Sequence, residues 1–288
     1  MIAKLLLPLG LAFIMFGMGL TLKVSDFTRL LKHPLPVALG LTVQMLLLPV
    51  LAFVLLMLFP MRPEYAVGVM ILAACPGGIT SNMLTHIARG DTALSITLTA
   101  ITSLAGMLSI PVVVGLAMTQ FMHQQLSGPL PVWQMARGVF LISTLPVIIG
   151  MAIHHRWPRA AQAIERRVRP ASLIVFALIV LGAFASQWRA MMSNIAEIGP
   201  VVVALNVLIM ALGWWLARQA RLAVSQRIAI AIEGGLQNAA LGIFVSATLL
   251  GNAAMMTPSI TYALMMNITV FAFILWLLAT RHVGRVRA

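Results

Sequence analysis

The stretch "AIEGGLQNAAL" (residues 231–241) decides how this chain is interpreted, because it places a carboxylate inside an apolar segment. A charged side chain at the centre of a membrane helix costs about 2.5–3.5 kcal/mol on insertion scales. Such a residue usually faces a partner charge, an ion or a water-filled cavity. Arg227 is the alternative partner for Glu233, but the helix between them spans about 9 Å, which leaves Glu233 deep inside the segment. The position therefore favours a functional acid over a structural ion pair.

The composition excludes a soluble globular protein. The chain has 288 residues, of which 61% are hydrophobic and 9% are charged, and its mean hydropathy is +1.02. A soluble domain carries about 25% charged residues. The net charge of +13 could suggest a nucleic-acid partner, but the basic residues lie in short loops between apolar segments. The single cysteine cannot form an internal disulfide.

Apolar segments separated by polar, proline or glycine breaks recur along the chain, most of them close to the length of about 20 residues that crosses a bilayer. They cover residues 3–22, 34–59, 65–88, 92–118, 132–153, 171–187, 198–217, 224–250 and 256–280. The first has Lys4 before its apolar run, as a signal peptide would, but it lacks a small-residue cleavage site followed by a polar chain. We therefore predict an all-α membrane protein with nine transmembrane helices and no separate soluble domain.

Basic residues give the expected orientation, since cytoplasmic loops carry an excess of lysine and arginine. With alternating spans, fifteen of the 19 basic residues fall on one side: Lys23, Arg29, Lys32, Arg89, Arg156, Arg159, Arg166, Arg167, Arg169, Arg218, Arg221, Arg227, Arg281, Arg285 and Arg287. The other four are Lys4, Arg62, Arg137 and Arg189. The bias predicts an outside N-terminus and a cytoplasmic C-terminus.

Segments 65–88 and 224–250 each carry a double glycine near the middle, followed by polar pairs. Pro76 precedes the first pair and Glu233 the second. Proline and glycine favour unwinding at mid-membrane, although paired glycines also serve close helix packing. Because the two segments run in opposite directions, they are typical of an inverted-repeat transporter with broken helices.

Oxygen-bearing side chains cluster around these breaks, as a hard cation such as Na⁺ requires. The candidates are Gln44, Ser81, Asn82, Ser95, Thr99, Glu233, Gln237 and Asn238. Ser95 and Thr99 share one helix face, and their alternative role is to bond their own backbone. Helix starts after Gly78 and Gly235 would offer N–H groups to an anionic substrate.

Three stretches resemble the bile acid:sodium symporter family, in its bacterial branch: "FGMGLTLKVSDF" (16–27), "CPGGITSNMLTHIARGDTALSITLT" (75–99) and "EGGLQN" (233–238). The resemblance covers essentially the whole chain and implies a panel domain, a core domain and two crossing discontinuous helices. The core would hold residues 34–118 and 198–288, with broken helices at 65–88 and 224–250. The panel would hold 3–22 and 132–187. The chain would begin at the segment matching the second span of ten-span members.

The same resemblance implies two Na⁺ sites behind the crossing, with Glu233 shared between them. The first would use Ser81, Asn82, Ser95, Thr99 and Glu233. The second would use Gln44, Glu233, Gln237 and the backbone carbonyls of Gly234 and Leu236. Substrate would meet Gly78, Ile79, Thr80, Asn238 and Asn267. Ile79 and Met266 stand where some relatives carry polar groups, which makes this cavity more apolar.

The implied activity is sodium-coupled symport of organic anions by alternating access, with two coupling ions. Pantoate, ketopantoate or a similar small hydroxy or keto acid is the expected substrate. Sodium-coupled transport of bile acids or steroid conjugates is one alternative, and proton-coupled transport of organic anions is another. The expected location is the bacterial inner membrane. The expected partners are the substrate and membrane lipids, with no nucleic acid and no obligatory protein partner.

Two other function classes fit the sequence poorly. We expect no enzyme, because one intramembrane acid cannot form an aspartyl dyad and no H-E-x-x-H motif occurs. Histidines lie only in loops or near the ends of spans. A channel would suit the broken helices, but the chain has no repeated filter motif.

Overall fold

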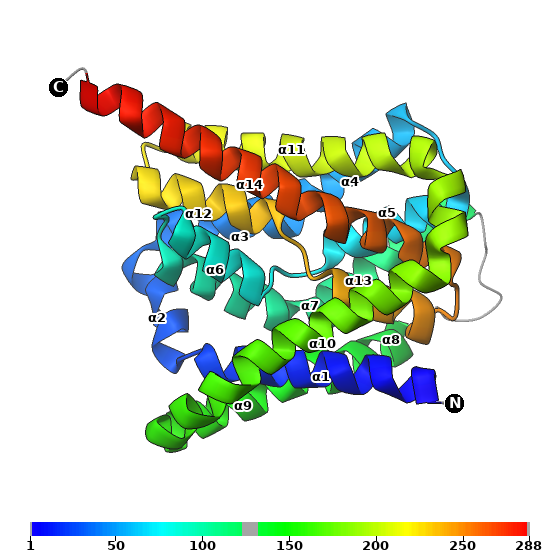
Figure 1. The fold of residues 1–288 in the computed structure, drawn as a ribbon, viewed down its shortest axis with the longest axis horizontal. Helices are drawn as coiled ribbons and strands as arrows, with labels where there is room; N and C mark the ends of the chain where they lie inside the picture. Colours follow the sequence, from blue (N-terminus) through cyan, green and yellow to red (C-terminus); the bar gives the residue numbers. More distant parts are fainter. Residues whose placement is uncertain (1, 123–131, 287–288) are drawn as a thin grey trace.

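The computed structural model describes residues 2–122 and 132–286, and the regular elements in that part of the chain are all helices (Figure 1). Within it, seven helical segments are long and apolar enough to cross a membrane. A bent pair, α5 (Pro63–Ala74) with α6 (Ile79–Ile87), would count as an eighth. The first helix is apolar over Leu6–Thr21, which is shorter. The chain is therefore a multi-pass, all-helical membrane protein, and the ninth span stays a prediction.

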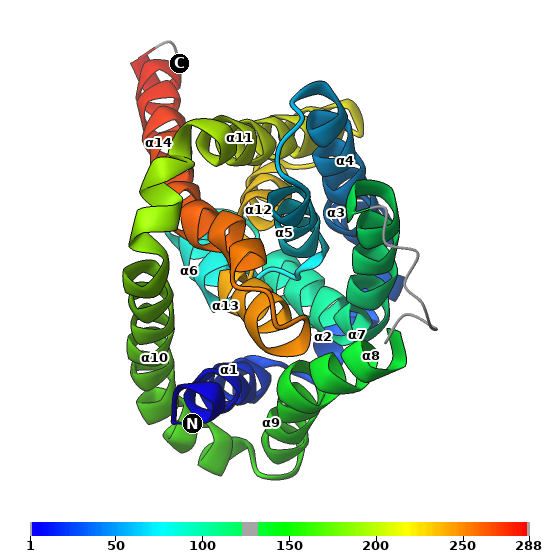
Figure 2. The same ribbon diagram turned by 90° about the vertical axis from the view of Figure 1, so that its right-hand side faces the viewer.

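One group of helices is called here the α1 group; in Figure 2 α1 and α9 lie at the bottom and α10 runs up the left edge. In this group α1 packs against both α9 and α10, which also contact each other. Its members are α1 (Ile2–Thr21), α8 (Val132–Val139), η2 (Phe140–Thr144), α9 (Leu145–Arg156) and α10 (Pro158–Ser193).

The remaining long helices form a second group, the α12 group, around the segment Val224–Leu249, in which residues 228–246 are all buried. Its first half is α3 (Pro34–Thr42), η1 (Val43–Leu47), α4 (Leu48–Leu58), α5, α6 and α7 (Thr92–Met122). Its second half is α11 (Ile195–Gln219), α12 (Val224–Gly235), α13 (Ala239–Phe244), η3 (Val245–Leu249), η4 (Ala254–Met256) and α14 (Thr257–Val286). The short helix α2 (Val24–Lys32) links α1 to α3 and contacts α7.

Proline placement explains several helix boundaries and two irregular turns. Pro34, Pro63 and Pro158 begin α3, α5 and α10, where the missing N–H has no partner to lose. The π-helical turns η1 and η2 each precede a proline at the second residue of the next helix, Pro49 or Pro146. A wider turn accommodates the absent hydrogen-bond donor, and such turns are frequent at functional sites.

At two places the helices extend beyond the predicted apolar segments. The segment placed at 171–187 belongs to α10, which begins at Pro158 and so includes Glu165 and the arginines before residue 170. Polar residues extend a helix beyond the apolar stretch where water can solvate them, and Glu165 lies 3.8 Å from Arg169, one turn away. Likewise α2 is helical although the sequence indicates a loop there. Of the basic residues counted above, Arg287 lies outside the described residues.

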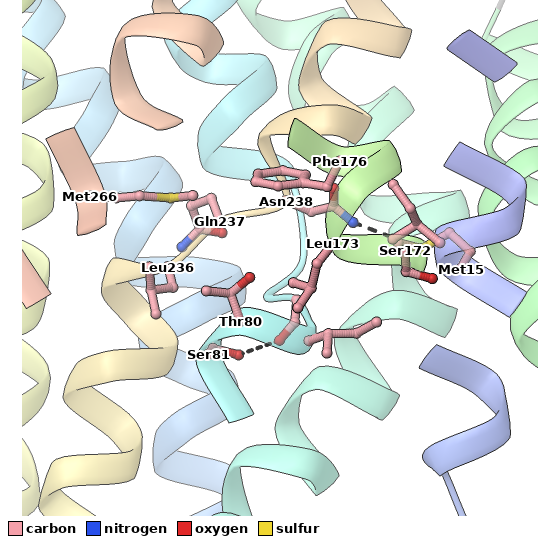
Figure 3. Close-up of a pocket in the computed structure, with 13 residues that line it drawn as sticks. Met15, Thr80, Ser81, Ser172, Leu173, Phe176, Leu236, Gln237, Asn238 and Met266 are labelled. Atoms are coloured by element: carbon pink, nitrogen blue, oxygen red, sulfur yellow. Dashed lines mark hydrogen bonds between the residues drawn. The ribbon is translucent and has the colours of Figure 1, made fainter. Parts of the chain in front are cut away.

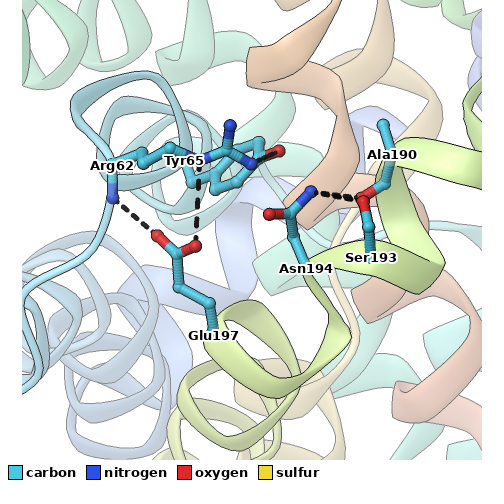
Figure 4. Close-up of polar contacts among 6 residues, drawn as sticks. All are labelled: Arg62, Tyr65, Ala190, Ser193, Asn194 and Glu197. Atoms are coloured by element: carbon cyan, nitrogen blue, oxygen red, sulfur yellow. Dashed lines mark hydrogen bonds and ion pairs between the residues drawn. The ribbon is translucent and has the colours of Figure 1, made fainter.

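Asn194 marks the point where the chain passes from the α1 group to the α12 group (Figure 4). Its Nδ2 donates to the carbonyl of Ala190 at 2.6 Å. One turn later, Glu197 accepts the backbone N–H of Arg62 at 2.7 Å and lies 3.7 Å from its Nε. The guanidinium of Arg62 sits over the Tyr65 ring, 4.2 Å from the centroid. This cluster ties the start of α11 to the loop before α5.

Candidate functional site

Both predicted broken segments are interrupted. The chain leaves helix between Ala74 and Ile79, and α5 and α6 meet at 63°. In the second segment α12 continues through Gly235 and α13 starts at Ala239. In the second segment, Gly234 and Gly235 are therefore the last two residues of α12. The next helix starts after Asn238, and not after Gly235 as the sequence predicts.

The two interruptions bond to each other and to flanking helices. The backbone N–H of Asn238 donates to the carbonyl of Pro76 at 2.9 Å. The carbonyl of Gly235 accepts Asn206 Nδ2 at 2.6 Å and the Tyr262 hydroxyl at 2.9 Å. Backbone freed from helical bonding is thus satisfied by protein groups, as unwound chain inside a membrane requires.

Asn206 and Tyr262 are positioning residues that the sequence reasoning missed. Both are buried. The sequence does indicate Asn206, because it is a polar residue inside the apolar segment 198–217 and a buried amide needs hydrogen-bond partners.

Glu233 lies at this junction with 1% of its surface exposed. The Ser95 hydroxyl donates to Oε2 at 2.7 Å, and the Thr99 hydroxyl donates to Oε1 at 2.5 Å. Arg227 directs its Nε to the carbonyl of Leu222 at 2.7 Å. The carboxylate is therefore held by hydroxyls, and the alternative of an Arg227 ion pair has no support among the described contacts.

The first predicted ion set is rich in acceptor oxygens. Asn82 Oδ1 lies 2.8 Å from Ser95 Oγ and 3.4 Å from Thr99 Oγ1. Each hydroxyl has a single hydrogen, yet each faces both this amide oxygen and the Glu233 carboxylate. Oxygen lone pairs are left over, which suits a hard cation. Ser81 Oγ donates to the carbonyl of Gly78 at 2.7 Å.

The second predicted set is brought together around η1. Gln44 Nε2 donates to Gln237 Oε1 at 2.6 Å and lies 3.3 Å from the carbonyl of Cys75. Gln237 Nε2 donates to the carbonyl of Gly234 at 2.8 Å. Both amides are buried. The described hydrogen bonds of the Glu233 carboxylate run to the first set, so a carboxylate shared by two ions stays a prediction.

Four of the five predicted substrate residues line one cavity of about 40 Å³ between the two helix groups (Figure 3). These are Gly78, Ile79, Thr80 and Asn238. The fifth, Asn267, does not line it; its Nδ2 donates to the carbonyl of Ala263 on its own helix at 3.0 Å. On the side of the α1 group the cavity wall is apolar except for Ser172. The remaining residues of the whole lining are Ile14, Met15, Ser81, Ser172, Leu173, Phe176, Leu236, Gln237 and Met266.

A larger cavity of about 440 Å³, called here the vestibule, lies between the same two groups. Ile79 borders both cavities, and Asn82 of the first ion set also borders the vestibule. Its other walls are Leu20, Thr21, Met83, His86, Thr92, Ile96, His154, Gln162, Glu165 and Arg169. The vestibule thus borders predicted ion and substrate residues on one side and the charged residues Glu165 and Arg169 of α10 on the other.

The donor set argues against a transition metal. Within the described residues, no three side chains of His, Cys, Asp or Glu come together as a metal site. Hydroxyl, amide and carboxylate oxygens are the ligands of hard cations.

Comparison with known proteins gives a consistent picture. The model of the sodium bile acid symporter family matches residues 8–194. An uncharacterized sodium-dependent transporter of Bacillus subtilis is 32% identical over 232 residues, which cover 81% of this chain and 70% of that protein. The human ileal sodium/bile acid cotransporter is 30% identical over 238 residues, covering 82% of this chain and 67% of the relative.

A plant relative matches more of this chain but less of its own length. The probable chloroplastic sodium/metabolite cotransporter BASS2 of Oryza sativa is 28% identical over 254 residues. The match covers 88% of this chain and 59% of the plant protein, so the chain spans a little over half of that relative.

Proposed function

Because the chain belongs to the sodium bile acid symporter family, we propose that it is a sodium-coupled symporter of small organic anions working by alternating access. It is a member of a transporter family and not an enzyme. The observation that carries the proposal is the buried Glu233 carboxylate, surrounded by the oxygens of Ser95, Thr99 and Asn82. A cation would offset the cost of this intramembrane charge.

Two coupling ions are proposed, both Na⁺. The first ion would be held by Ser81, Asn82, Ser95, Thr99 and Glu233. The second would be held by Gln44, Glu233, Gln237 and the carbonyls of Gly234 and Leu236. The first oxygen set includes Ser95 of α7, whereas the second includes Gln44 of η1. Because the two sets lie on different elements, they support two ions rather than one.

The α1 group would be the panel and the α12 group the core. The division is supported by the way α1, α9 and α10 pack mainly on one another. Movement of one group against the other would close the vestibule and expose the ion sets on the opposite face. For coupling, Na⁺ must bind the two states unequally.

Pantoate or ketopantoate is the proposed substrate. The lining of the small cavity combines the Thr80 hydroxyl, the Asn238 amide and the start of α6 with apolar walls from Ile79, Leu173 and others. N–H groups at a helix start suit a carboxylate, and apolar walls suit a methyl-bearing carbon. A rigid steroid would need a far larger opening, so bile acids are the weaker alternative.

The proposed location is the bacterial inner membrane, with the vestibule facing the cytoplasm. Arg169 of α10, which borders the vestibule, supports this orientation, since cytoplasmic sides carry an excess of basic residues.

Uptake of labelled pantoate into proteoliposomes tests the proposal. At fixed pH, an inward Na⁺ gradient should drive accumulation, whereas an inward proton gradient without Na⁺ should not. Accumulation driven by protons alone would replace the sodium mechanism with the proton-coupled alternative. Taurocholate accumulation under the Na⁺ gradient, with no pantoate accumulation, would assign the steroid class instead.

A further inference from the structure

The amide of Asn238 is oriented by the backbone. Its Oδ1 accepts the N–H of Leu241 at 3.1 Å and so caps the start of α13. The oxygen is committed to that donor, and Nδ2 therefore points the other way, toward the α1 group (Figure 3).

The partner of Asn238 Nδ2 is the thioether of Met15 on α1, at 3.8 Å. A thioether sulfur is a weak acceptor, whereas buried amide N–H groups normally find oxygen acceptors. The same sulfur lies 3.5 Å from the hydroxyl of Ser143, so two donors converge on it. A weak acceptor thus occupies a place where two donors would bind an oxygen more strongly.

The cavity beside Met15 is too small for an organic acid. It measures about 40 Å³, whereas ligand sites enclose about 300–1,000 Å³. Some side chain on its wall must move before a substrate can enter. Methionine has three rotatable bonds and no branch, and it adapts to irregular space more readily than Ile14, Leu173 or Phe176, which line the same wall.

We infer that Met15 is a specificity-determining residue: its thioether holds the place of a substrate oxygen at Asn238 Nδ2 and Ser143 Oγ, and it withdraws when the substrate binds. The length of the displaced side chain then limits how bulky an acid fits between the two helix groups. This inference rests on the proposed function, because it assigns the α1-group half of the same substrate site.

Met18 provides the matched control. It lies one turn further along α1, is also fully buried, and its sulfur faces Ser103 Oγ at 4.0 Å. It does not line the cavity. Substituting Met18 therefore changes the packing of α1 without changing the wall that a substrate would touch.

The test is binding of a graded series of 2-hydroxy acids, from lactate to 2-hydroxyhexanoate, together with pantoate. Affinities are measured by calorimetry in detergent at saturating Na⁺ for wild type, Met15→Ala, Met15→Leu and Met18→Ala. Met15→Ala should raise the affinity ratio of the longest to the shortest acid by about tenfold, the scale on which apolar pockets discriminate one or two methylenes. Met15→Leu and Met18→Ala should leave that ratio within about twofold.

The outcomes separate the two levels of the proposal. If the affinity ratio of the longest to the shortest acid in Met15→Ala equals that of wild type, while acid binding and Na⁺-dependent stabilisation are intact, the role of Met15 is overturned and the proposed symporter function stands. Equal ratio changes in Met15→Ala and Met18→Ala would also overturn it, since loosened packing of α1 would then be the cause. No binding of any acid by wild type, alongside intact Na⁺-dependent stabilisation, would remove the substrate class and the role of Met15 with it.

Discussion

Glu233 keeps its carboxylate in place because Gly77 leaves it room. A Cβ atom at Gly77 would overlap Glu233 Oε1 and would lie 2.9 Å from its Cδ. The neighbouring Gly78 is extended and a Cβ there would meet no atom within 4 Å. The two glycines of "PGG" therefore have different roles: the first leaves space for the acid, and the second lines the cavity.

Gly77→Ala should weaken Na⁺ binding about ten- to hundredfold. The methyl group would push the carboxylate away from Thr99 and Ser95, and a hydrogen bond to a charged group is worth about 1.5–3 kcal/mol. Gly78→Ala should leave Na⁺ binding within about twofold and lower the affinity for substrate. The Na⁺ dependence of thermal unfolding in detergent measures the first effect. Equal half-saturation by Na⁺ in both variants would contradict this reading of Gly77.

At the residue scale, the sequence predicts the acid and its hydroxyl neighbours but not the residues that complete the site. Glu233 stands out because an isolated charge in an apolar segment is costly, and the spacing of Ser95 and Thr99 places both on one face. Met15 looks like any other apolar residue of its segment. Its contact with Asn238 joins positions far apart in the chain, and no local pattern encodes it.

At the scale of elements, η1 makes Gln44 part of the site. The π-helical turn Val43–Leu47 precedes Pro49, and it places Gln44 against Gln237 and the unwound carbonyl of Cys75. The first oxygen set, by contrast, depends on α6, α7 and α12. If each set holds one ion, a substitution of Gln44 in η1 should abolish binding of the second ion and leave binding of the first ion unchanged.

Gln44→Leu should lower the Hill coefficient for Na⁺ from about two to about one, since the coefficient cannot exceed the number of interacting sites. The control is Thr42→Val in the same segment, where the described hydrogen bond of the hydroxyl runs to the carbonyl of Ala38 on its own helix, at 2.8 Å. Na⁺ titration of thermal stability gives the coefficient. An unchanged coefficient in Gln44→Leu would mean that the second set does not hold an ion.

Helix breaks were predicted from glycine and proline, but their exact positions were not. In α5–α6 the interruption coincides with Pro76, which lacks the donor that a helix needs. In α12–α13 it falls at Leu236–Asn238, because the Gly235 carbonyl is drawn out by Asn206 and Tyr262 from other helices. Tertiary partners therefore set the second break. The early start of α10 has a different cause: polar residues continue the helix into water, and apolar length alone cannot show how far.

At the scale of the whole molecule, the two helix groups meet unevenly. The interface is nearly closed at the Met15 cavity, whereas it is open at the vestibule that His86, His154 and Arg169 border. Under the proposed function, this asymmetry would correspond to a transporter open to the side of its basic loops. The alternation of basic residues predicts which side that is, but the sequence alone does not show that the cavity opens there.

A cysteine at His86 should react only from the cytoplasmic side. Cys75, the one native cysteine, is buried and is replaced by alanine in the background. In inside-out vesicles a membrane-impermeant maleimide should label His86→Cys and not Glu64→Cys, which lies in the first turn of α5 on the opposite side. Right-side-out vesicles should reverse the pattern. Labelling of both variants from the same side would contradict the orientation.

The most direct test of the central claim is the binding of ²²Na⁺ to purified wild type, Glu233→Gln and the control Glu64→Gln. Wild type and Glu64→Gln should bind Na⁺ saturably, and Glu233→Gln should lose that binding, since the amide keeps the shape of the side chain but removes its charge. Saturable Na⁺ binding by Glu233→Gln with wild-type affinity would show that this buried carboxylate is not the coupling-ion ligand.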